Sequence, residues 1–126
     1  MKRIVFAAVL LAAVIVFNFF CLFTIAKIRN ESVQKLDLLY SYVRYDDREK
    51  TALECEKFTE YWFSEHRILS QMVRHDFLDQ ITVAVSGFVP LAEFDETAEL
   101  ASEINRCKIL IEEMWDSERP ILRNIL

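Results

Sequence analysis

The feature that most constrains the fold is the uncharged apolar stretch from Ile4 to Ala26. Its twenty-three residues contain only Asn18 and Thr24 as polar interruptions. As a helix rising about 1.5 Å per residue, the stretch is roughly 34 Å long, enough to cross a hydrocarbon core of about 30 Å. We therefore expect residues 1–26 to form an N-terminal transmembrane anchor, with the membrane lipid bilayer as its first partner.

Two other interpretations of this stretch are weaker. A cleaved signal peptide also places basic residues before an apolar run, but that run is about 7–15 residues long, and Thr24-Ile25-Ala26 is a poor cleavage site. Lipid attachment at Cys21 is disfavoured because two bulky phenylalanines precede it. We expect an uncleaved anchor.

The orientation of the anchor is not decided by its flanking charges, because Lys and Arg occur on both sides of it. A short tail before the first span usually stays in the cytosol, as in signal peptides. We expect a single-pass protein of the cell membrane whose C-terminal domain is extracytoplasmic.

Composition indicates the fold class of the chain after the anchor. Residues 27–126 are the size of one domain and carry 13 basic and 20 acidic residues, a formal charge of −7 that argues against nucleic-acid binding. One Gly and two Pro in 126 residues suit helices. The predicted fold class is all-α, an N-terminal transmembrane helix that continues into a small antiparallel helical bundle of three to four helices, residues 27–126.

Apolar residues at 3-4 spacing define four helices. The first leaves the membrane with a seam of six residues and ends at Asp46-Asp47; its seam is Ile25, Ile28, Ser32, Leu36, Leu39 and Val43. We expect Leu38, Tyr42 and Tyr45 to widen this face, and the tyrosine group of Tyr40, Tyr42 and Tyr45 to be partly buried rather than a binding surface.

The second helix is predicted from about Asp47 to Arg74, with Trp62 as the central plug of the bundle. Its heptad seam is Ala52, Cys55, Thr59, Trp62, His66, Leu69 and Val73.

The third helix starts near Asp76, which we expect to act as an N-terminal signal together with Asp79. Its β-branched run from Ile81 to Val85 also suits a strand, but a single strand would have no partner. We expect Pro90 to end or kink this helix, with Gly87 easing the bend.

The fourth helix is predicted from Asp95 or Thr97 to about Glu118, with Pro120 ending it. Its core-facing residues are Leu100, Ile104, Cys107, Ile111 and Met114. The apolar tail after Pro120 is expected to pack back on the bundle.

Four elements together carry a resemblance to a known family: a span that begins with Met-Lys-Arg, Trp62 in the helix after an acidic turn, the heptapeptide His75-Asp76-Phe77-Leu78-Asp79-Gln80-Ile81, and the closing Pro120-Ile121-Leu122-Arg123-Asn124-Ile125-Leu126. Over essentially all 126 residues, the chain resembles the bacterial family known as domain of unknown function 4363. The resemblance implies a membrane-anchored helical protein of Gram-positive, clostridium-like bacteria and implies no activity. Gly87 and Pro90 depart from the family pattern, which argues against the family's continuous third helix.

Few residues are placed for chemistry. His75 and Asp79 are four apart and could hold a metal with Asp76, but two or three such ligands are a weak metal site, and capping of the turn is favoured. His66 lies on an apolar seam, where a hydrogen-bonded core histidine is favoured over a catalytic base. We expect no enzyme activity, no cofactor and no metal.

Cys55 and Cys107 lie on core-facing stripes of two helices that run in the same direction. Outside the membrane they could form a disulfide. The favoured alternative is that both are small buried hydrophobic residues.

Two function classes remain. The first is an interaction module or accessory subunit that docks on another membrane protein or on itself, with a filled core and an exposed apolar patch at the tail or around Phe88. The alternative is an extracytoplasmic ligand-sensing or ligand-binding domain with a pocket near Trp62 and His66. The candidate interaction or pocket residues are Trp62, His66, His75, Asp79, Phe88 and Asn124.

Overall fold

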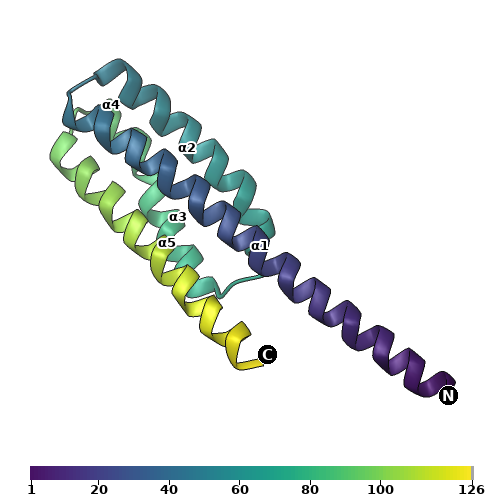
Figure 1. Ribbon diagram of the computed structural model, residues 1–126. Coiled ribbons are helices and arrows are strands. Elements are labelled where there is room, and N and C mark those ends of the chain that lie inside the picture. Colours follow the sequence, from purple (N-terminus) through teal and green to yellow (C-terminus); the bar gives the residue numbers. More distant parts are fainter. Residues whose placement is uncertain (126) are drawn as a thin grey trace.

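The computed structural model describes the backbone of residues 1–125 and the side chains of residues 1–118. Throughout this part of the chain the elements are helices, so the predicted all-α fold is confirmed. They are α1 (Lys2–Arg44), α2 (Arg48–Leu69), α3 (His75–Ser86), α4 (Phe88–Glu93) and α5 (Thr97–Ile125). They form an antiparallel bundle from which the first half of α1 projects (Figure 1).

The bundle has four columns. α1 packs against α2 and α5, and α3 and α4 pack against the same two helices from the other side. α3 and α4 follow one another along a single column, so the chain ascends in α1, descends in α2, ascends in α3 and α4, and descends in α5 (Figure 1). α2 and α5 therefore run in the same direction and occupy diagonal positions.

α1 is one continuous helix because residues 2–44 contain neither Gly nor Pro. The buried residues of this helix are the six predicted seam positions: Ile25, Ile28, Ser32, Leu36, Leu39 and Val43. The predicted widening of the seam is wrong for Leu38 and Tyr45, which are exposed. In the described part of the chain, α1 packs on α2 and α5 alone, so a narrow stripe of its surface faces the core.

The projecting part of α1 is apolar and exposed. Its most apolar 18-residue window has a mean hydropathy of 2.8, and none of that window is buried. By length and composition this is a candidate membrane span.

α2 begins one residue after Asp47, whose carboxylate accepts a hydrogen bond of 3.2 Å from the backbone N–H of Lys50. It ends at Leu69 rather than near Arg74, and the turn after it lets Val73 reach the core. At the start of α2 the seam is shifted by one residue. Thr51 is buried there and Ala52 is exposed, because a helix of 3.6 residues per turn drifts from a strict heptad.

The third column is helical, as predicted, but its helices begin and end at residues other than those predicted. α3 begins at His75, and Arg74 occupies the N-cap position without a side-chain bond, so Asp76 is not the cap. The helix breaks at Gly87, three residues before Pro90. The proline ring would clash with the carbonyl of Ser86 in a continued helix, whereas its missing N–H costs nothing in the first turn of α4.

α5 continues to Ile125, so the prediction that Pro120 ends this helix is wrong. A proline inside a helix removes one hydrogen bond and favours a bend, and a helix of 29 residues retains enough of the others to continue. The predicted packing of the tail after Pro120 lies outside the described side chains.

Trp62 is fully buried, as predicted for the central plug. Its indole N–H donates a hydrogen bond of 3.0 Å to the Thr82 hydroxyl of α3. Phe58 and Phe88 pack nearby with ring centroids 5.8 Å apart, which joins α2 to α4. These aromatic side chains connect α2 to both helices of the third column.

We expect Trp62→Ala to lower the free energy of unfolding by about 3–5 kcal/mol, because it removes a fully buried indole and leaves a cavity. Denaturant titration of the full chain in detergent micelles measures this. The control Phe63→Ala, at a half-exposed position on α2, should change it by about 0.5 kcal/mol or less. A loss below about 1 kcal/mol for Trp62→Ala would contradict the packing.

Candidate functional site

The predicted pocket around Trp62 and His66 is a packed pair. His66 is half-buried and meets the Trp62 ring edge-on, with ring centroids 6.5 Å apart. The indole N–H of Trp62 is already bonded to Thr82. The structure thus brings the two predicted residues together, but the indole has no free donor to offer a ligand.

The predicted histidine–aspartate pair lies on the surface. His75 and Asp79 are exposed in the first turns of α3, and Asp76 pairs with Arg74 at 3.5 Å. Among the described residues, no group of three potential ligands could hold a metal ion. This region is the start of a helix rather than a site.

Phe88 is fully buried, so the predicted exposed patch around it is wrong. The break at Gly87 starts a new helix that packs on α2, and this turns Phe88 inward with Val89 and Leu91 partly covered. The side chain of Asn124 lies outside the described residues.

Cys55 and Cys107 are both free and fully buried. They lie on α2 and α5, the diagonal helices, of which no two described Cα atoms come within 8 Å. A disulfide needs Cα atoms within about 7 Å, so the disulfide alternative is wrong and the buried-hydrophobe alternative fits. Burial, with a smaller contribution from nearby glutamates, raises the pKa of each thiol to about 12.

We predict that neither core thiol reacts with an aromatic disulfide reagent at pH 8, because each is buried and stays protonated well below a pKa of about 12. The measurement uses Cys21→Ser protein, folded and then denatured, and should give two reactive thiols only after denaturation. If the mass of the protein under non-reducing conditions is lower than that of the reduced protein by two hydrogen atoms, the two thiols form a disulfide. That result would contradict the diagonal placement.

Polar contacts fix α1 against both of its neighbours just beyond the projecting segment. Arg29 donates two hydrogen bonds to one Glu112 oxygen of α5, at 2.7 and 3.1 Å. On the other side, the Tyr61 hydroxyl of α2 donates a hydrogen bond of 3.1 Å to Glu31. Burial raises the pKa of Tyr61, so it stays a neutral donor. Nearby, Ser32 Oγ is buried and forms no hydrogen bond with the described residues.

At the end of the bundle far from the N-terminus, α1 and α4 finish in the same way. Two residues after the last residue of each helix lies an aspartate, Asp46 or Asp95, with a φ of 56°, in the left-handed region that an L-residue rarely adopts. In each case the aspartate N–H and the next N–H bond back to the last turn of the helix. These bonds run from Asp46 to Val43, Asp47 to Tyr42, Asp95 to Ala92 and Glu96 to Leu91. The two loops are paired Schellman motifs.

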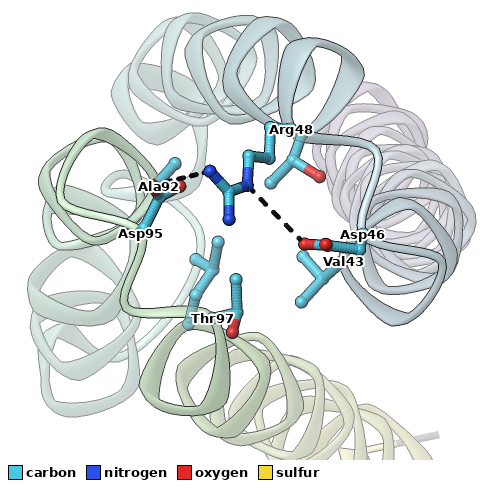
Figure 2. Close-up of a pocket in the computed structure, with 8 residues that line it drawn as sticks. Val43, Asp46, Arg48, Ala92, Asp95 and Thr97 are labelled. Carbon is cyan, nitrogen blue, oxygen red and sulfur yellow. Dashed lines mark ion pairs between the residues drawn. The ribbon is translucent and has the colours of Figure 1, made fainter.

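Arg48 connects the two loops. Its guanidinium lies 3.2 Å from Asp95 and 3.9 Å from Asp46, above Val43 and Thr97 (Figure 2). The hollow beneath it has a volume of about 10 Å³, enough for about one water molecule. This end of the core is therefore closed, and what it offers is a surface.

We define the acidic end as residues 44–50 and 93–99. It holds three basic and seven acidic residues, a formal charge of −4. Two aromatic side chains are exposed on this surface: Tyr45 is 80% exposed and Phe94 is 75% exposed. Each directly precedes one of the aspartates with a positive φ. Sequence reasoning missed this surface, although the repeated order of an aromatic residue and two acidic residues, Tyr-Asp-Asp and Phe-Asp-Glu, is visible in the chain.

We expect Asp46→Gly and Asp95→Gly each to raise the free energy of unfolding by about 0.5–1 kcal/mol, because glycine adopts a positive φ without a steric cost. Denaturant titration measures this. The matched control is Asp46→Ala, which removes the same carboxylate but keeps a Cβ, and should not stabilise. Stabilisation by Ala as well would assign the effect to charge instead of backbone strain.

Comparison with known proteins identifies a family. The family model described as a domain of unknown function, DUF4363, matches residues 19–125. No curated protein and no solved structure matches the chain.

Proposed function

Since the chain belongs to the DUF4363 family, whose description carries no activity, we propose from its own structure that it is a single-span membrane-anchored interaction module. In this proposal, α1 crosses the cell membrane and the bundle, on the extracytoplasmic side, acts as an accessory subunit of a membrane or envelope complex. We assign the bundle no catalytic role.

The observation that carries the proposal is the continuity of α1. The same helix supplies the candidate span and the central seam of the bundle, with no linker between them. Between Ala26 and Arg44 it rises about 27 Å, so the acidic end is held at that height above the membrane. A rigid spacer of this kind supports presentation of a surface to a partner.

The burial of Ile25 supports an uncleaved anchor. Ile25 is part of the bundle core, although it lies within the apolar stretch. Cleavage after Ala26 would remove this core residue. A signal peptide has no reason to pack into the mature domain.

The ligand-binding alternative has less support. Its predicted pocket residues, Trp62 and His66, are packed against each other, and the indole donor is satisfied. A ligand site needs polar groups that converge on free space. The acidic end instead combines negative charge with two exposed aromatic side chains, which suits a protein partner with a basic surface.

We expect crosslinking in native membranes, with an epitope-tagged full chain, to recover one membrane protein in near-equal amount. The double substitution Tyr45→Ala/Phe94→Ala should lower that recovery by about tenfold or more, because exposed aromatic residues are typical anchors of interfaces. Raising the salt concentration should weaken recovery, since charge attraction is screened.

The matched control is Leu53→Ala/Phe63→Ala, a pair of half-exposed apolar residues elsewhere on the bundle, and it should leave recovery unchanged. Recovery of the chain alone, or recovery insensitive to the Tyr45→Ala/Phe94→Ala change, would contradict docking at the acidic end. Release of the chain from membranes by alkaline carbonate would contradict the anchor.

A further inference from the structure

A hollow of about 380 Å³ is lined by residues 20–31 of α1 and by Glu65 and Ile68 near the end of α2. We call it the foot hollow. The side chains that decide what it can hold are Phe20, Phe23, Lys27, Glu31, Glu65 and Ile68. They divide into an apolar half toward the N-terminus of α1 and a charged half toward the bundle.

The apolar half continues the surface of the candidate span. Phe20 and Phe23 belong to the apolar stretch Ile4–Ala26, and Phe23 is 70% exposed. Ile68 of α2 lines the same hollow and is also exposed. With α1 across a membrane, these three side chains lie at the boundary of the hydrocarbon core, where acyl chains are the available apolar neighbours.

The charged half begins one helical turn farther along. Lys27 brings one cation to the hollow, and Glu31 and Glu65 bring two carboxylates. Glu31 is held in place by the Tyr61 hydroxyl at 3.1 Å. In the part of the chain with described side chains, neither Lys27 nor Glu65 forms an ion pair.

The charges at the foot hollow suit some lipid headgroups better than others. The three charged side chains sum to −1, which repels a headgroup whose only charge is a phosphate. A headgroup with both a phosphate and an ammonium matches the cation and the carboxylates. A primary ammonium also donates hydrogen bonds to carboxylates, which a quaternary ammonium cannot do.

We propose that the foot hollow binds a zwitterionic phospholipid with a primary-amine headgroup, of the ethanolamine class. The phosphate lies at Lys27, the ammonium lies between Glu31 and Glu65, and an acyl chain runs along Phe20, Phe23 and Ile68. The site is separate from the acidic end and rests on the proposed function only in that α1 spans the membrane.

The test is native mass spectrometry of the full chain, released from membranes that contain equal amounts of ethanolamine, choline and glycerol phospholipids with the same acyl chains. Retention of the ethanolamine lipid should exceed that of each other lipid by about fivefold or more. Glu65→Gln should remove this preference. The matched control Glu60→Gln, an exposed glutamate on the same helix, should keep it.

A second pair of variants tests the apolar half. Phe23→Ala should lower retention of all three lipids, whereas Phe6→Ala, at a position that is also 70% exposed, should not. Equal retention of the three lipids, a preference for the anionic glycerol lipid, or a preference that survives Glu65→Gln would each overturn the proposal. If the protein inserts into the membrane but shows no headgroup preference, only the proposed lipid site is contradicted. If the protein does not insert, the proposed membrane anchor is contradicted.

Discussion

The rest of the structure depends on the packing of one seam along α1. The six seam residues between Ile25 and Val43 face inward at 3-4 spacing. Both flanking helices, α2 and α5, pack against this stripe. Because the seam begins inside the apolar stretch, the bundle cannot tilt relative to the candidate span without exposing Ile25 and Ile28. Hydrophobic burial therefore couples the position of the bundle to the direction of the candidate span.

Seam positions could be predicted from the sequence because they depend on local periodicity. All six buried residues of α1 and five core positions of α5, including Ile104 and Met114, follow from spacing alone. Residues beside a seam could not be predicted, because their burial depends on where neighbouring helices lie. Leu38 and Tyr45 have the same local pattern as buried residues, but no helix covers them.

The same distinction explains the errors at the candidate site. Cys55 and Cys107 share a direction and a core-facing stripe, but the order of helices around the bundle places them on a diagonal. That order depends on which helices are neighbours in space. The periodicity of apolar residues along one helix gives no information on its neighbours. The two prolines also act differently. The helix breaks at Gly87, just before Pro90, as local chemistry predicts, whereas α5 passes through Pro120.

Two aspartates at the acidic end adopt a backbone conformation that costs most L-residues more than it costs glycine. Glycine would close both Schellman turns at lower backbone cost, yet Asp46 and Asp95 both keep a positive φ. Their contacts to Arg48 do not explain this choice, because the guanidinium and both carboxylates are largely exposed and such pairs contribute little. What the two carboxylates do provide is negative charge beside Tyr45 and Phe94, at a distance from the candidate span that an unbroken helix fixes. The Schellman hydrogen bonds of the two turns hold the positive φ. In the proposed docking, the two carboxylates therefore add to the negative charge that a basic partner meets beside the two aromatic side chains.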